Sequence, residues 1–409
     1  MLDSISVEGF KSIRELKNLE LGQVNVFVGA NGSGKTNLLE ALGVLGAAAS
    51  GRVDDQALLR RGVRPGVPAL YKSSHRGRPY RLFITLSATW KTAEESAAYK
   101  VGLNNPIDRP NPAWEYKTES ISRNGRKIMG RAPRGATLGQ HAPRTEYPMR
   151  PDTGFAALVR GREEYRGAPA ELLSALDDFA TFAPTTPILR GIAPDPAPRA
   201  PLGLFGGQLA EAVQDLLDPQ AQRFGNLELD EMLELLDWVE DLSVGPPSRQ
   251  ILSPSVPTAR LVVRFKDAWM REGRNVLSGY DASEGALYVL FTLVLALHPQ
   301  APRLLAIDNF DQAMHPLLAR ALTKLFCEQV LGSENQRQVL LTTHNPIVLD
   351  GLNLRNERIR LFTVDRPGGT TQVKPIRVTE LLLQELEQKH VTLSELWVMG
   401  RLGGVPDLL

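Results

Sequence analysis

The stretch Gly29-Ala30-Asn31-Gly32-Ser33-Gly34-Lys35-Thr36 decides the fold, because it matches the phosphate-loop pattern G-x-x-x-x-G-K-[ST] at every fixed position. An apolar run at 24–28 precedes it, and apolar residues at helical spacing follow it from Leu38 to Leu45. The pattern predicts a strand, a glycine-rich turn and a helix, in that order. Such a turn directs its backbone N–H groups at an anion, and the new helix adds its positive end.

This loop predicts a site for a nucleoside triphosphate and Mg²⁺. We expect Lys35 to reach the β- and γ-phosphates and the Thr36 hydroxyl to ligate Mg²⁺. The backbone of the other loop residues is expected to surround the phosphates; these residues are Gly29, Ala30, Asn31, Gly32, Ser33 and Gly34.

Composition constrains the class of protein only loosely. The 409 residues suffice for two or three domains, and a formal charge of +1 argues neither for nor against nucleic acid. The one cysteine, Cys327, lies in a helix-like apolar stretch and is expected to be a core residue in a reducing cytosol. The longest apolar run, 286–297, is too short for a membrane helix, which needs about 20 residues, and no signal peptide is visible. We therefore expect a soluble, cytoplasmic chain with no membrane contact.

Patterning divides the chain into four expected parts. They are 1–90, with the phosphate loop; 91–255, an insertion of helical and irregular structure; 256–375, where αβ patterning returns; and 376–409, a helical tail. Near-continuous apolar runs predict parallel strands buried on both faces. These runs are 261–265, 304–307, 339–341 and 359–364.

Other segments are predicted from local signals. A hairpin is expected at 114–127, because Asn124-Gly125 is a strong turn signal. Further strands are expected at 4–7, 19–21 and 80–86, and helices at 168–182, 207–217 and 227–242.

Basic residues outnumber acidic ones between Lys117 and Arg150. They form either an arm that contacts duplex DNA or a partner, or a solvated, partly disordered insertion. The residues concerned are Arg123, Arg126, Lys127, Arg131, Arg134 and Arg144.

Four pieces downstream of the loop carry further chemistry. Asp308 ends an apolar strand and is expected beside the loop, where it orders the Mg²⁺ shell. Ser283-Glu284-Gly285 opens the apolar helix 286–297 and offers a hydroxyl and N–H groups to an anion, besides capping that helix. Asp311 to Pro316 follows the Asp308 strand, and His344 ends another strand, where it is placed to hydrogen-bond a γ-phosphate. Leu277-Ser278-Gly279 imitates the Ser283 motif, but no helix follows it directly.

In this order the pieces resemble the ATPase heads of the RecF/SMC/ABC-type superfamily. The resemblance implies an α/β P-loop NTPase fold, an ABC-type head with two lobes, of the short RecF/OLD-like AAA kind. The opening, 5–13, is similar to the family's first strand and turn. Its Walker A loop, signature motif, Walker B strand, D-loop and switch histidine correspond to 29–36, 283–285, 304–308, 311–316 and His344. The insertion of about 270 residues between Thr36 and Asp308 also suits this family.

The resemblance also implies a homo-oligomer. Two heads are expected to sandwich two ATP molecules, with Ser283 of one subunit on the γ-phosphate held by the Lys35 loop of the other. Asp311, as a D-loop residue, is then expected to face the partner subunit. The Q-loop is not placed, since Gln56 and 72–74 both remain options.

Asn309 departs from the family, which usually has a catalytic glutamate after the Walker B aspartate. An amide orients water but cannot accept its proton. Three interpretations follow: slow or conditional hydrolysis, with phosphate itself or Asp311 taking the proton; ATP binding with almost no turnover; or a deliberate substitution that traps ATP. We favour the first, so the chain is expected to be a slow ATPase.

Three functions remain open. The first is a regulatory ATPase of prokaryotic antiviral defence with a separate effector such as a nuclease; no sustained heptads are present, and the roughly 65 residues after His344 are too short for a Toprim nuclease. The second is a RecF-like repair ATPase that binds duplex DNA, and the third is a nearly inert ATP-bound scaffold. The apolar segment 393–406 either docks an effector or caps the core.

Overall fold

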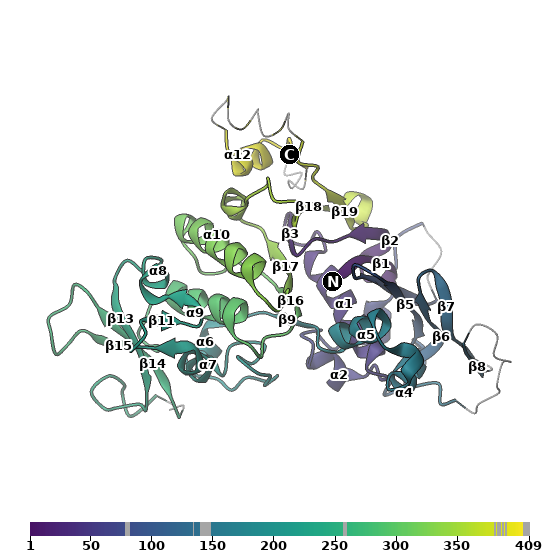
Figure 1. Cartoon of the computed structure of the whole chain (residues 1–409), viewed down its shortest axis with the longest axis horizontal. Helices are drawn as coiled ribbons and strands as arrows, with labels where there is room; N and C mark the ends of the chain where they lie inside the picture. The colour runs from purple at the N-terminus through teal and green to yellow at the C-terminus, as the bar shows by residue number, and fades with distance from the viewer. Residues whose placement is uncertain are drawn as a thin grey trace.

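Two β-sheets enclose the helix that follows the phosphate loop (Figure 1). The computed structural model describes the whole chain except residues 78–81, 134, 140–148, 257–259, 380–381, 383–385, 387, 389–390 and 404–409. The predicted strand–loop–helix unit is confirmed as β3 (Val24–Val28) and α1 (Lys35–Ala49). Helix α1 is buried along almost its whole length, because it packs against strands of both sheets.

The central sheet has six strands in the order β19-β18-β3-β17-β16-β9. All neighbours are parallel except β19, which runs antiparallel to β18. The bounds, besides β3, are β9 (Ala180–Phe182), β16 (Leu304–Ile307), β17 (Gln338–Thr343), β18 (Ile359–Asp365) and β19 (Gln372–Pro375). The predicted strands at 304–307, 339–341 and 359–364 are thus confirmed.

Both faces of this sheet are buried, as the apolar runs predict. Val26 and Leu341 lie in the core beside α9 (Glu284–Leu297) and α10 (Pro316–Gly332). Phe27 and Leu340, their chain neighbours, lie in the core beside α1. Side chains of a strand point alternately to opposite faces, so only a sheet covered on both sides requires apolar residues at consecutive positions.

The second sheet has seven antiparallel strands in the order β2-β1-β4-β5-β6-β7-β8. Their bounds are β1 (Leu2–Phe10), β2 (Ile13–Glu20), β4 (Ile84–Lys91), β5 (Ser96–Asn104), β6 (Glu115–Arg123), β7 (Arg126–Ala132) and β8 (Gly135–Leu138). The predicted hairpin is confirmed as β6–β7, and its turn residues Asn124 and Gly125 both have positive φ, as such turns require. The prediction for 80–86 is met from Ile84 on, while 80 and 81 lie outside the described residues.

Short helices cover this half of the molecule. They are α2 (Asp55–Leu59), α3 (Pro68–Tyr71), α4 (Phe155–Val159), the 3-10 turn η1 (Glu163–Tyr165) and α5 (Ala168–Asp177). Because β4 and β5 pair along their length, the sheet crosses residue 91, where the proposed insertion begins. The four-part division of the chain stays a prediction.

A second lobe, with α6–α9 and β10–β15, stands apart from the seven-stranded sheet (Figure 1). It holds the sheets β10-β11-β12 and β13-β14-β15. The bounds are α6 (Thr186–Leu189), α7 (Leu209–Leu216), α8 (Leu229–Leu233), β10 (Leu217–Asp218), β11 (Arg223–Phe224), β12 (Leu227–Glu228), β13 (Val239–Gly245), β14 (Val262–Asp267) and β15 (Val276–Ser278). The strand expected at 261–265 exists as β14, but its antiparallel partners place it here and not in the parallel sheet.

Two of the three predicted helices were too long. The helix expected at 168–182 ends at Asp177, and 180–182 is the edge strand β9. The helix expected at 227–242 is replaced by β12, the five-residue α8 and the start of β13. In both cases tertiary pairing with a distant strand determines the structure of an apolar run that is compatible with either form.

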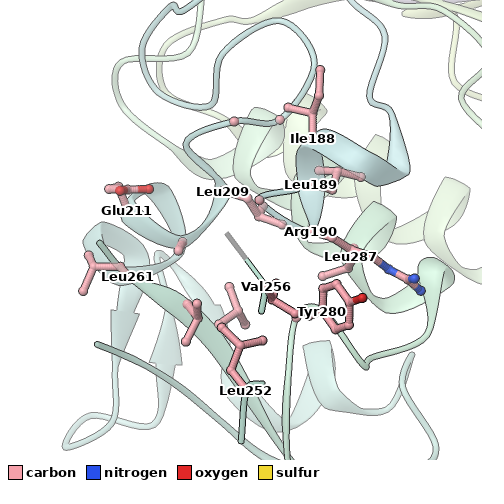
Figure 2. Close-up of a pocket in the computed structure, with 17 residues that line it drawn as sticks. Ile188, Leu189, Arg190, Leu209, Glu211, Leu252, Val256, Leu261, Tyr280 and Leu287 are labelled. Atoms are coloured by element: carbon pink, nitrogen blue, oxygen red, sulfur yellow. The ribbon is translucent and has the colours of Figure 1, made fainter. Parts of the chain in front are cut away.

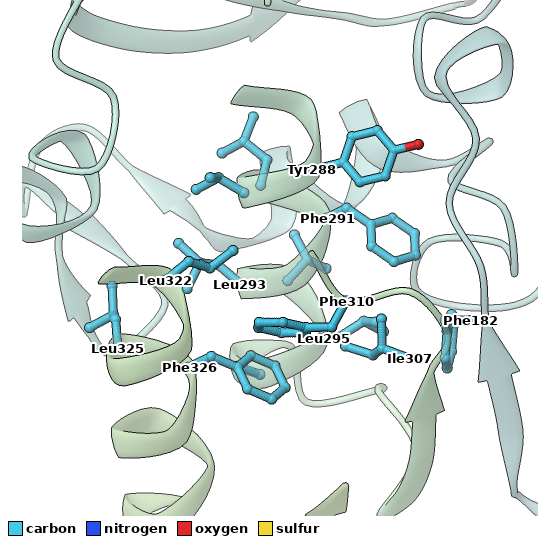
Figure 3. Close-up of a cluster of buried hydrophobic side chains, with 14 of the residues drawn as sticks. Phe182, Tyr288, Phe291, Leu293, Leu295, Ile307, Phe310, Leu322, Leu325 and Phe326 are labelled. Carbon is cyan, nitrogen blue, oxygen red and sulfur yellow. The ribbon is translucent and has the colours of Figure 1, made fainter. Parts of the chain in front are cut away.

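A core of aromatic and aliphatic side chains joins the second lobe to the central sheet (Figure 3). It contains Phe291 from α9, Phe326 from α10 and Phe182 from β9. The lone Cys327 on α10 is buried as predicted, and burial raises its pKa to about 12. The buried Arg337 donates to carbonyl oxygens at the end of α9, including His298 O at 2.9 Å, and so ties α9 to β17.

The C-terminal part packs onto the central region. The 3-10 turns η2 (Pro346–Gly351) and η3 (Pro367–Gly369) flank β18, and α12 (Leu393–Val398) lies against η2. Leu393 and Trp397 are buried in the main core, which supports core capping by this segment. Within the described ranges, no helix has the length and apolar character to span a membrane.

Candidate nucleotide site

The carboxyl ends of five parallel strands meet at one edge of the central sheet. Val28, the last residue of β3, lies opposite Thr343 of β17 and Thr363 of β18, and Ile307 of β16 lies opposite Phe182 of β9. The segments that leave these strands therefore gather in one place, where open α/β sheets bind their ligands. These segments are the phosphate loop, Asp308, His344, residues 183–185 and the turn after Asp365.

The phosphate loop has the backbone that its glycines predict. Gly32 and Gly34 have φ of 76° and 107°, a region that side-chain-bearing residues rarely adopt. A Cβ on Gly34 would also lie 2.1 Å from the Thr371 hydroxyl oxygen. Within the loop, the buried Ser33 hydroxyl has no hydrogen-bond partner, which fits a cradle whose polar groups serve a ligand.

The Lys35 ammonium is held inside the loop. It donates to the carbonyl oxygens of Gly29 and Ala30 at 2.7 and 3.0 Å. Burial lowers the pKa of Lys35, and the carboxylates of Asp308 and Asp311 oppose that shift. A cation with only neutral acceptors in its first contacts is suited to exchange them for phosphate oxygens.

Thr36 and Asp308 meet as the sequence predicts. The Thr36 hydroxyl donates to the two Asp308 carboxylate oxygens at 2.9 and 3.2 Å, and the Thr342 hydroxyl also donates to that carboxylate. One hydroxyl and one carboxylate fit Mg²⁺, which keeps several waters and takes further oxygens from phosphates. The described residues hold no cluster of three or more metal-ligating side chains, so the nucleotide itself would have to complete such a site.

Asn309 lies at the surface beside this pair in a left-handed conformation, with φ of 54°. Its backbone N–H donates to the Thr342 hydroxyl at 2.9 Å. Asparagine tolerates this backbone region better than glutamate does, because its short side chain bonds locally. The backbone therefore offers a physical reason for asparagine at this position.

Asp311 is turned inward within its own chain. Its carboxylate is 3% exposed and accepts from the Thr343 hydroxyl at 2.7 Å. That Asp311 faces a partner subunit stays a prediction. The second carboxylate oxygen lies 3.8 Å from His344 Nε2. The hydroxyl at the end of β17 draws Asp311 inward, next to the half-exposed histidine on the same strand end.

Ser283 caps α9, as predicted. Its hydroxyl accepts from Ala286 N at 3.3 Å, and both Ser283 and Glu284 are exposed. Among the hydrogen bonds of the described residues, none joins Ser283, Glu284 or Gly285 to the phosphate loop. The imitation at Ser278 is excluded as an anion site, because that residue is fully buried and bonds Asp281.

A contact on the outer side of the loop was not predicted. Thr371, just before β19, donates its hydroxyl to Ser33 O at 2.7 Å and shares a 2.7 Å hydrogen bond with Ser12. Arg366, just after β18, donates to Gly32 O at 3.3 Å. No local pattern signals these contacts, since more than 330 residues separate the partners; only the strand order β18-β3 reveals them.

The basic residues of 117–150 divide into different roles. Arg131 is buried near Glu119, and Arg123 bonds the Arg166 carbonyl and lies 3.9 Å from Glu95. Arg126 and Lys127 are exposed, while Arg134 and Arg144 lie outside the described residues. Of the six cations of the predicted DNA arm, the described ones that are exposed are therefore Arg126 and Lys127, at the β6–β7 turn.

Neither expected Q-loop position is seen to contact the phosphate loop in the described chain. Gln56 is exposed on α2, and the Ser73 hydroxyl bonds His75 at 2.9 Å. The second lobe also has an apolar cavity of about 40 Å³ between α6, α7, α9 and β14 (Figure 2). That volume is far below the roughly 300 Å³ at which small-molecule sites begin, so this cavity is not the nucleotide site.

Comparisons with known proteins agree with this geometry. A family model described as "AAA domain, putative AbiEii toxin, Type IV TA system" matches residues 178–350, and one described as "AAA ATPase domain" matches residues 1–58. The chain is 35% identical over 114 residues to DNA replication and repair protein RecF of Clavibacter michiganensis subsp. michiganensis, covering 27% of this chain and 26% of that one. RecF of Leifsonia xyli subsp. xyli is 57% identical over 93 residues, 22% of each chain. The matched part thus spans about a quarter of these relatives.

Solved structures show the same fold. An Smc head bound to the C-winged helix domain of ScpA aligns with a TM-score of 0.51 and 14% identity, covering 92% of this chain and 98% of that one. An Smc head with an extended coiled coil, bound to the C-terminal domain of ScpA derived from Pyrococcus furiosus, gives 0.52 and 13%, covering 95% and 99%. At such low identity the likeness concerns the fold alone.

Proposed function

We propose that the chain is an ATPase head of the RecF/SMC type, that two copies dimerise around ATP, and that the dimer regulates a separate effector, a nuclease, in prokaryotic antiviral defence. The observation that carries the nucleotide part is the cluster at the sheet edge, where Lys35 lies inside the loop and Thr36 lies 2.9 Å from Asp308. Lys35 and the loop amides would hold the phosphates, and Thr36 with Asp308 would hold Mg²⁺.

Dimerisation is supported by the position of Ser283, which has no contact with the phosphate loop of its own subunit among the described hydrogen bonds. Its exposed hydroxyl and the free N–H groups at the start of α9 form an anion-binding end, yet they have no hydrogen bond to the phosphate loop among the described residues. A second copy would bring this end to the phosphates held by the Lys35 loop.

A protein partner is supported by one hairpin of the second lobe. Trp269 is 84% exposed, and Met270 and Val276 of the same β14–β15 hairpin are also exposed. The backbone N–H groups of Trp269 and Met270 both donate to Asp267, so a structured turn presents the indole. A large apolar group held outward in this way is typical of interaction sites. An Smc head of the same fold has been solved with a separate protein domain bound.

The defence role is supported by a family description alone. The family model that matches residues 178–350 names a putative toxin of a Type IV TA system in its description. A fold does not determine a function, so this part depends on analogy.

Slow or conditional hydrolysis follows from Asn309. Water would attack the γ-phosphorus, the bond to the β–γ bridging oxygen would break, and ADP and phosphate would leave. With no carboxylate at position 309, the proton of the water would pass to a phosphate oxygen or to the Asp311 carboxylate, which lies 3.8 Å from His344 Nε2.

Two measurements on the purified chain test the proposal. Light scattering should show a dimer with ATP and a monomer with ADP, and steady-state turnover should be slow and abolished in Lys35→Ala. A chain that stays monomeric with saturating ATP would contradict the dimer. Turnover that persists in Lys35→Ala would contradict the assigned site.

The RecF similarity favours a second candidate, an ATPase of DNA repair that binds duplex DNA. ATP-dependent DNA binding that weakens steeply with salt, and turnover stimulated by duplex, would favour it. A third candidate, a nearly inert ATP-held scaffold, is favoured by Asn309. Nucleotide retained through purification with no measurable turnover would support that function.

A further inference from the structure

The turn between β18 and β19, residues 366–371, forms hydrogen bonds with the outer side of the phosphate loop. Thr371 donates its hydroxyl to Ser33 O and its backbone N–H to Ser12 O at 2.9 Å. Arg366 donates Nη1 to Gly32 O at 3.3 Å. Two neighbouring loop carbonyls are thus held by one turn.

Arg366 is fixed by its own turn yet open to solvent. Its Nε donates to Gly369 O at 2.9 Å, and its backbone carbonyl accepts from Gly369 N. The residue is exposed, and no carboxylate among the described residues forms an ion pair with it. A guanidinium has five donors in a planar fork, so Nη2 and the second Nη1 hydrogen remain available.

The contacts of Arg366 resemble those of Lys35. Both cations bond neutral carbonyl oxygens of the same loop, Lys35 on the inside and Arg366 on the outer rim. Charge-assisted bonds to phosphate are stronger than bonds to a neutral carbonyl, and arginine binds phosphate through two donors at once. A triphosphate seated in the loop would therefore attract both side chains.

We propose that Arg366 is a phosphate-binding residue of this site, a second cation that contacts the γ-phosphate and makes the loop favour a triphosphate over a diphosphate. The inference rests on the proposed nucleotide site and adds a residue from the opposite end of the chain. The lysine lies at Gly29 and Ala30 and the arginine at Gly32, so the two cations flank the loop.

Equilibrium binding of ATP and ADP in the presence of Mg²⁺ tests this residue. Arg366→Ala should weaken ATP binding about tenfold while changing ADP binding by about twofold or less, because the substitution removes one charge-assisted contact to the γ-phosphate, which ADP lacks. Arg366→Lys should recover part of the ATP affinity. Arg360→Ala is the matched control, since Arg360 also lies on β18 but pairs with Glu20.

Thr371→Val separates charge from loop support. It removes the hydroxyl that holds Ser33 O without changing charge, so it should weaken ATP and ADP by equal factors. Equal losses for both nucleotides in Arg366→Ala would show loop support alone and overturn the inference, as would unchanged binding of both. If the wild-type chain binds neither nucleotide, the proposed function itself fails. Binding that Lys35→Ala abolishes but Arg366→Ala leaves intact overturns only the role of Arg366.

Discussion

The phosphate-loop edge and the start of α9 differ in how complete they are within one subunit. At the edge, Lys35 is held by two carbonyls, and Thr36 reaches Asp308. At the start of α9, Ser283 bonds only its own helix and is exposed. The difference teaches that one chain can organise the phosphate-loop part of the site by itself; in the proposed function, the start of α9 serves a second copy of the chain.

The two regions are nevertheless linked through the core. Arg337, which precedes β17, holds the far end of α9, and β17 ends beside His344. A shift of α9 would therefore act on the strand that leads to the phosphate-loop edge. The four predictions that follow are intended to separate the two regions or to refine the contrast between them.

Removing the lysine should have the largest effect. Lys35→Ala should lower ATP affinity by at least about 100-fold, roughly 2.7 kcal/mol, because several charge-assisted contacts disappear together. Fluorescent-nucleotide titration measures it, and circular dichroism should show an unchanged fold. Lys374→Ala, on the neighbouring β19, is the control and should bind normally. Retained ATP affinity in Lys35→Ala would mean that the edge is not the nucleotide site.

At the start of α9 we expect a substitution to impair dimerisation and to leave ATP affinity unchanged. Ser283→Arg should leave ATP affinity of the monomer within about twofold but prevent ATP-dependent dimerisation, since a long side chain would fill the space that a partner's phosphates need. Losing the helix cap should cost about 1 kcal/mol of stability. Light scattering with ATP and with ADP gives the result, with Ser283→Thr as the cap-preserving control. Normal dimerisation of Ser283→Arg would refute the arrangement across two subunits.

Asn309→Glu tests whether the absence of a carboxylate general base at position 309 limits hydrolysis. If a carboxylate at this position accepts the proton of the water, turnover should rise by about 10²-fold. Stability should fall by about 1 kcal/mol, because glutamate is strained at φ of 54°. Turnover and thermal unfolding are the two measurements. Asn309→Gly should be at least as stable as wild type without the gain in turnover. Unchanged turnover in Asn309→Glu would show that the residue does not limit hydrolysis.

The smallest expected effect is the pH dependence of nucleotide binding. Burial lowers the pKa of free Lys35, and bound phosphate favours the charged ammonium. Nucleotide binding should therefore take up a fraction of a proton at alkaline pH, and affinity should fall as pH rises through the pKa of the free protein. Calorimetry in buffers of different ionisation enthalpy measures the uptake. The uptake should disappear in Lys35→Arg, and if it persists there, another group is responsible.

The sequence predicts the phosphate-loop edge of the central sheet well, because the motifs that form this edge are local. A loop pattern between an apolar strand and a helix, and an aspartate at a strand end, are each encoded within about ten residues, and Thr36 and Asp308 do meet. The strands at 180–182 and 239–245 were missed, because a short apolar run fits helix and strand equally and its pairing partner lies far away.

The side-chain details were less predictable. The inward turn of Asp311 depends on the Thr343 hydroxyl at the end of another strand. The role of Arg366 depends on β18 being the neighbour of β3, a fact of sheet order that no motif carries. In the proposed function, Ser283 reaches a phosphate only through a second copy of the chain, which one sequence does not specify.

The single buried cysteine has a practical consequence for such experiments. Because its pKa is raised to about 12 and its sulfur lies inside the core, Cys327 should not react with maleimide reagents under native conditions. A cysteine introduced at an exposed position, such as Glu284→Cys on α9 or Trp269→Cys on the hairpin, would therefore carry a fluorophore or a spin label at one defined place. The chain can therefore be labelled at one site without removing its native cysteine, and distance measurements between labels could follow the approach of two copies in real time.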